Sequence, residues 1–195
     1  MMKKITLRKI CLSIGITLIL LSLVMLILWQ CNVSGNSKHI YEYVHTIESL
    51  IPEAQAAVIE PRADNKMPSL NVQGNNFIAI MEFPLADVAL PVGASWDKAD
   101  AYPCLYSGSA YDGSLIIGTS NQNGQLEFVK DISVGNTIYL TDMTGSQFTY
   151  TVSDIQYSKH ADNQALFSET ADSTIFVKNI YAFEYIIIRC NAAGH

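Results

Sequence analysis

The stretch Phe77-Ile-Ala-Ile-Met-Glu-Phe-Pro84, followed by Val88-Ala-Leu-Pro-Val92, decides the fold class of this chain. Both runs are short and rich in β-branched, aromatic and other apolar residues, and proline ends the first, which is typical of strands. Similar runs follow at short intervals. We predict strands at Asn76–Glu82, Ala86–Leu90, Ser114–Gly118, Thr137–Asp142, Gln147–Ile155, Ser173–Val177 and Glu184–Asn191.

The segments between these strands favour a compact all-β domain. Met143-Thr-Gly-Ser146 predicts a hairpin turn between two of the strands, and Gly124–Ile132 predicts one short helix. Several short strands with one or two helices indicate a small β-barrel or sandwich. Upstream, apolar residues at helical spacing predict a helix over His39–Ile51, closed by Pro52, and Pro61–Pro68 is interpreted as a linker.

The N-terminus predicts a membrane anchor. Ile10–Trp29 contains no charged residue, proline, asparagine or glutamine, and twenty helical residues are long enough for a hydrocarbon layer of about 30 Å. The basic residues before it are typical of the cytoplasmic side. We therefore expect a cytoplasmic tail (residues 1–9), a single transmembrane span (residues 10–30), a membrane-proximal helix and linker (residues 31–68), and an extracellular domain (residues 69–195).

A cleaved signal peptide is the alternative interpretation of this segment. Its apolar stretch is usually about 7–15 residues and ends at a site with small residues. Here the apolar run is longer and ends in the sequence Trp29-Gln30-Cys31, which has no small-residue cleavage site. Both features favour an uncleaved anchor. Beyond residue 9, eight basic residues face 18 acidic residues, a net charge of −10 that argues against nucleic acid as a partner.

The four cysteines are Cys11, Cys31, Cys104 and Cys190, without a C-x-x-C motif. No histidine stands at a zinc-like spacing, so we expect neither a metal site nor a cofactor. An extracellular location permits a disulfide between Cys104 and Cys190, and two separate buried thiols are the favoured alternative.

The order of the strand sequences after Leu70 resembles the sortases, membrane-bound cysteine transpeptidases of Gram-positive cell walls. Phe77–Val92 resembles the opening strands of that family, and Gly113-Ser-Leu-Ile-Ile-Gly118 resembles the strand that ends in its Gly-His. Ser173-Thr-Ile-Phe-Val177 and Tyr185–Cys190 are similar to its last two strands. The resemblance covers about 120 residues and implies a closed β-barrel of about eight strands with short helices, behind an N-terminal transmembrane helix.

All three catalytic residues of the family are replaced at the matching positions. Thr119 stands in place of the histidine, Lys178 in place of the cysteine and Tyr185 in place of the arginine. A threonine hydroxyl is no general acid near neutral pH, and a lysine is an ammonium there unless it is strongly desolvated. A tyrosine hydroxyl lacks the positive charge of a guanidinium and its two parallel N–H donors. The replacements argue against sortase catalysis.

These observations predict a catalytically inactive sortase homologue, a pseudoenzyme that binds a sorting-signal-like peptide or an envelope partner. We expect Thr119, Ser120, Lys178 and Tyr185 to converge at a peptide-binding site. Two alternatives stay open: an active transpeptidase or peptidase with relocated residues, and a purely structural or regulatory envelope protein. For the first, Lys178 and the loop residue His160 are the candidates, although a solvated lysine and a solvated histidine are the simpler interpretations.

Overall fold

The computed structural model describes residues 2–57, 65–120, 126–167, 170–179 and 182–193. Of residues 2–11, 13, 29–38, 163 and 164 it describes the backbone alone. The chain divides into two compact units, Met1–Lys38 and His39–His195. The first unit is helical throughout its described part, as the first segment of helix α1 (Met2–Leu50).

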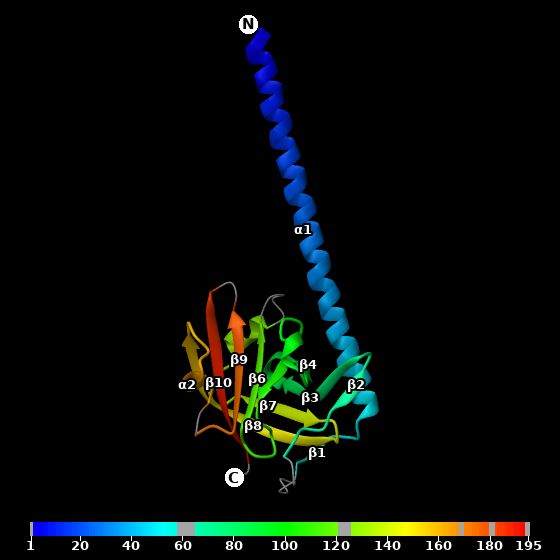
Figure 1. The fold of residues 1–195 in the computed structure, drawn as a ribbon, viewed down its shortest axis with the longest axis vertical. Coiled ribbons are helices and arrows are strands. Elements are labelled where there is room, and N and C mark those ends of the chain that lie inside the picture. The colour runs from blue at the N-terminus through cyan, green and yellow to red at the C-terminus, as the bar shows by residue number, and fades with distance from the viewer. Residues whose placement is uncertain (1, 58–64, 121–125, 168–169, 180–181, 194–195) are drawn as a thin grey trace. The chain divides into compact units, whose positions relative to one another are not determined.

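Strands form most of the regular secondary structure of the second unit (Figure 1). They are β1 (Gln55–Ala56), β2 (Leu70–Val72), β3 (Asn75–Phe83), β4 (Val88–Gly93), β5 (Cys104–Ser107), β6 (Leu115–Ser120), β7 (Thr137–Asp142), β8 (Ser146–Ser158), β9 (Ser173–Asn179) and β10 (Glu184–Ala192). Short helical turns lie between them: η1 (Pro84–Ala86), η2 (Trp96–Lys98), η3 (Glu127–Asp131) and α2 (Asn163–Leu166).

Eight strands within the described residues close a barrel in the order β3-β4-β5-β6-β9-β10-β8-β7, with β7 pairing back to β3. The short strands β1 and β2 add to β8 and β3 at its margins. Two neighbouring pairs, β4 with β5 and β6 with β9, are parallel. The mainly β fold, closed as a barrel of about eight strands, is confirmed.

Alternating apolar residues of these strands fill the barrel. Ile117 of β6, Ile175 of β9 and Ile188 of β10 belong to one buried cluster, together with residues from β3, β4, β7 and β8. A second cluster lies between β3 and the last turns of α1, where it contains Val44 and Ile47, whereas Ile40 of the same helix belongs to the first cluster. The predicted helix over His39–Ile51 therefore exists, ends at Leu50 before Pro52, and contributes to the core of the compact unit.

Two of the predicted elements differ from the structure. The strand predicted from Ala86 begins at Val88, because Pro84–Ala86 forms a 3-10 turn and Asp87 then adopts a left-handed conformation (φ 52°). The helix predicted over Gly124–Ile132 is a 3-10 turn at Glu127–Asp131, and its predicted first residues lie outside the described residues. Of the predicted linker, residues 61–64 also lie outside them, and residues 65–68 have no regular secondary structure.

The membrane anchor stays a prediction. Among the helical residues that the structure describes, none form a helix with the length and apolar character needed to cross a membrane. The predicted domain boundaries at residues 9, 30 and 68 likewise stay predictions.

Candidate functional site

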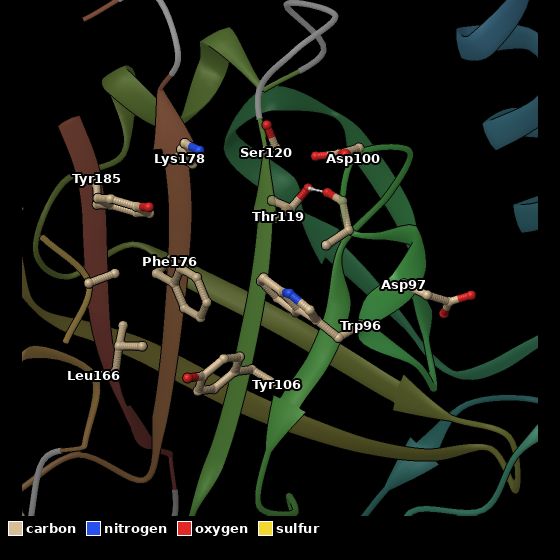
Figure 2. Close-up of a pocket in the computed structure, with 12 residues that line it drawn as sticks. Trp96, Asp97, Asp100, Tyr106, Thr119, Ser120, Leu166, Phe176, Lys178 and Tyr185 are labelled. Carbon is tan, nitrogen blue, oxygen red and sulfur yellow. Dashed lines mark hydrogen bonds between the residues drawn. The ribbon is translucent and has the colours of Figure 1, made fainter. Parts of the chain in front are cut away.

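Three predicted site residues form one row across three neighbouring strands. Ser120 at the end of β6 pairs with Lys178 of β9, and Lys178 pairs with Tyr185 of β10. Neighbouring strands lie about 4.8 Å apart, and directly paired residues point to the same face of a sheet. The row lines a pocket of about 320 Å³ on the outer face of the barrel (Figure 2).

The next row of residues on the same face of the sheet reaches the pocket through Phe176. Gly118 pairs with Phe176, and Phe176 pairs with Ile187. A Cβ atom on Gly118 would lie 2.6 Å from the indole of Trp96 and closer still to the ring of Phe176. The absence of a side chain at Gly118 therefore lets the two aromatic rings pack directly on the backbone of β6.

Aromatic side chains make one side of the pocket apolar. The rings of Trp96 and Phe176 lie 5.5 Å apart between centroids, and Tyr106 packs edge-on against both, at 5.2 and 5.4 Å. Trp96 is 43% exposed and Tyr106 is 41% exposed. Such half-exposed rings offer a surface on which an apolar part of a ligand can pack.

A pair of hydrogen bonds fixes the wall that carries Trp96. The carbonyl oxygen of Ala99, just after η2, accepts from the hydroxyl of Thr119 at 3.1 Å and from the backbone N–H of Ser120 at 2.9 Å. Thr119 is buried, and its hydroxyl is directed at this carbonyl (Figure 2). Thr119 thus lies at the predicted site but holds the wall of the pocket rather than presenting a free donor to it.

The opposite wall comes from the connection between β8 and β9. Leu166 of α2 is buried against Phe176 and Ile187 and reaches the pocket. Arg189 of β10 ties this connection to the barrel: its guanidinium donates to the carbonyl oxygen of Ala165 at 2.9 Å and forms an ion pair with Asp154 at 2.6 Å. Arg189 is therefore engaged in holding the wall, two rows from Lys178.

The fold of the chain is similar to that of several solved structures. The chain is similar to the Clostridium perfringens sortase D5 transpeptidase (15% identity, TM-score 0.55, covering 83% of this chain and 99% of that one). It is also similar to sortase C1 of Streptococcus agalactiae (12%, TM-score 0.53, 84% and 90%) and to a lid mutant of sortase A from Corynebacterium diphtheriae (18%, TM-score 0.52, 60% and 70%).

The fold is that of the sortases. At these sequence identities, the structural similarity is evidence for the fold alone. No protein-family model and no curated protein sequence matches the chain.

Within this sortase-like fold, the two described cysteines are buried and unpaired. Cys104 and Cys190 are both free thiols, so the interpretation as separate buried thiols agrees with the structure. Burial raises the pKa of Cys190 to about 12. Burial, and next the negative charge of Asp97, raise the pKa of Cys104 to about 12. Since the thiolate is the nucleophilic form, neither side chain is activated for attack.

Neither His160 nor Lys178 has the environment that a relocated catalytic residue needs. His160 is exposed and is not among the residues that line the pocket; its backbone closes a turn with the hydroxyl of Ser158. Lys178 is exposed, whereas a nucleophilic lysine needs desolvation. In the described part of the chain, no three His, Cys, Asp or Glu side chains are grouped so that they could hold a metal ion.

The sequence did not indicate the two walls of the pocket. Trp96, Asp100 and Tyr106 come from the connection after β4 and from β5, and Leu166 comes from α2. A tryptophan within the polar stretch Ser95-Trp-Asp-Lys98 was the available signal, because an isolated large aromatic residue in a loop is often part of a binding surface.

Proposed function

We propose that this chain is a membrane-anchored, extracytoplasmic protein that binds a cell-surface peptide in a sortase-like groove without cleaving it. The observation that carries the proposal is the row of Ser120, Lys178 and Tyr185 across β6, β9 and β10. The row lines a pocket, and two of its members, Lys178 and Tyr185, stand at positions where the resemblance implies catalytic groups. An extended peptide can pack apolar side chains on the aromatic wall and donate or accept hydrogen bonds at this row.

Several features support binding without catalysis. At the three positions that match the catalytic residues of the family, Thr119, Lys178 and Tyr185 carry a hydroxyl, an exposed ammonium and a phenol. None of these groups replaces an imidazole, a thiolate or a guanidinium. The cysteines that the structure describes are buried, and Arg189 is engaged elsewhere. In a set of residues that acts as a unit, loss of one member already removes most of the rate enhancement.

The proposed anchor and location rest on the sequence of the N-terminal unit. The run Ile10–Trp29 has no charged residue, and Lys3, Lys4, Arg8 and Lys9 precede it. Its described large apolar side chains, from Leu12 to Leu28, are exposed in the isolated chain. A continuous exposed apolar surface of this kind is typical of contact with lipid or with another protein. We place the remaining chain outside a Gram-positive cell membrane.

The proposal is tested by measuring binding and cleavage of LPxTG-like peptides with the purified chain in detergent micelles. We expect Lys178→Met to weaken binding by about 1–3 kcal/mol, the scale of a hydrogen bond to a charged group, with little change in Tm. Lys130→Met is the matched control, because Lys130 is an exposed lysine of η3 that does not line the pocket.

We further expect no cleavage or transfer product. Product above a heat-denatured control, lost in Lys178→Ala, would contradict the proposal and favour a catalytic lysine. Absence of binding to any peptide, combined with association with another envelope protein, would favour the structural alternative.

A further inference from the structure

Two side chains of the polar row, Ser120 and Lys178, carry donors without an acceptor among the described residues. The Oγ atom of Ser120 is buried and has no hydrogen-bond partner among the described residues. Lys178 forms no ion pair within the same part of the chain, although Asp97 and Asp100 line the pocket with it. An ammonium has three donors and no acceptor. A ligand that fits this row therefore brings acceptor oxygens, and preferably a negative charge.

The opposite side of the row carries one negative charge. Figure 2 shows Asp100 on the side of Ser120 away from Lys178, with its carboxylate directed toward the side of Ser120, whereas Asp97 points away. Asp100 directly follows Ala99, whose carbonyl oxygen accepts two hydrogen bonds from β6, so its backbone is held in place. A carboxylate accepts hydrogen bonds only. The pocket thus offers donors at Lys178 and Ser120 and an acceptor at Asp100.

The last residue of a peptide matches this arrangement. Its free carboxylate provides two acceptor oxygens and a negative charge, and its own backbone N–H is a donor a few ångströms away. An internal peptide segment offers a neutral carbonyl instead, which makes a weaker hydrogen bond to an ammonium than a carboxylate does. The half-exposed rings of Trp96 and Tyr106 lie beside the row and suit an apolar side chain of the same peptide.

We propose that the groove selects peptides by a free C-terminal carboxylate, which Lys178 and Ser120 hold while Asp100 accepts the N–H of the last residue. This inference rests on the proposed peptide-binding function and narrows its ligand class from peptides in general to peptides with a free carboxyl end.

The test compares two N-acetylated peptides with the same apolar sequence, ending in Phe-Leu, one as the free acid and one as the primary amide. Binding to the full chain in detergent micelles is measured by calorimetry at low and at high salt. We expect the acid to bind at least tenfold more tightly than the amide at low salt. Salt should reduce the preference, because Lys178 is exposed and salt screens its charge.

Three variants separate the contribution of the Lys178 charge to binding from the contribution of the rest of the pocket. Lys178→Met should abolish the preference for the acid, because it weakens binding of the acid much more than binding of the amide. Ser120→Ala should reduce the preference severalfold. Lys130→Met should retain it in full. Equal affinities of acid and amide for the unaltered chain would overturn this inference and leave peptide binding standing. If neither these two peptides nor a longer peptide with an internal LPxTG-like segment binds, both proposals fail.

Discussion

Gly118 makes room for two aromatic rings that line the pocket. Its place in β6 is opposite Phe176, and the space that a side chain would fill is occupied by the rings of Phe176 and Trp96. Thr119 and Ser120, which follow directly, hold the wall that carries Trp96 through the carbonyl of Ala99. Of three consecutive residues of one strand, Gly118 thus makes room for the aromatic rings, Thr119 holds the wall, and Ser120 is a proposed ligand contact.

Substitution of Gly118 by alanine should be costly at this position. The added methyl group must displace Phe176, Trp96 or both, and overpacking of this kind typically costs about 1–3 kcal/mol. We expect Gly118→Ala to lower the free energy of unfolding by that amount and to weaken peptide binding, as measured by urea unfolding and calorimetry.

Shortening the opposing ring provides the control for this prediction. Phe176→Leu removes bulk at the point of the clash, so the double variant Gly118→Ala/Phe176→Leu should be more stable than the sum of the two single effects. Strictly additive effects would show that the methyl group is accommodated elsewhere.

At the scale of the elements, the longest strands could be predicted from the sequence and the shortest could not. Thr137–Asp142 was predicted with its bounds, and β3, β6, β9 and β10 differ from prediction by at most two residues at an end. Their runs are long enough to show composition and alternation. The strands β1, β2 and β5 have two, three and four residues, which is too short for any periodic signal.

The candidate site shows the same division. Lys178 and Tyr185 were located because they occupy definite places in strands whose order could be recognised. Trp96 and Leu166 were not located, because they lie in short helical turns within the connections between strands. The loop carrying Trp96 is held by hydrogen bonds to the backbone carbonyl of Ala99. Every residue has such a carbonyl, so the sequence does not reveal which one is used.

The packing of α1 against β3 makes stability depend on pH. Burial, and next the negative charge of Glu48 in α1, raise the pKa of Glu82 in β3 above 4.5. The folded state then holds this proton more tightly than the unfolded state. Its contribution to stability is complete at low pH, and it is lost as the pH rises from about 4.5 through the raised pKa of the folded state.

Glu82→Gln removes this dependence while keeping the shape of the side chain. We expect the variant to be more stable than the unaltered chain at pH 7 and no more stable at pH 4, measured by urea unfolding at both values. Glu127→Gln, at an exposed position in η3, is the control. A stability difference that is the same at both pH values would argue against a titrating Glu82.

For the whole molecule, the proposed topology predicts what a protease outside the cell can reach. If residues 10–30 span the membrane and residues 69–195 lie outside, protease added to intact cells should remove the domain and leave a small membrane-bound fragment. Detection with separate N-terminal and C-terminal tags distinguishes the two products. Full protection of the domain in intact cells, together with digestion after permeabilisation, would reverse the proposed orientation.

The parallel pairing of β6 with β9 has a consequence for the order of events in folding. It joins Ser120 to Lys178 across the intervening strands β7 and β8, and Tyr185 arrives only with the final strand. Contacts between distant parts of a chain form slowly, because the entropy of closing the loop is lost before the contact is gained. A nascent or truncated chain that lacks β10 lacks Tyr185 and also Arg189, which holds one wall of the pocket at Ala165. We therefore expect the proposed binding site to be complete only once the C-terminal strand has been made and docked.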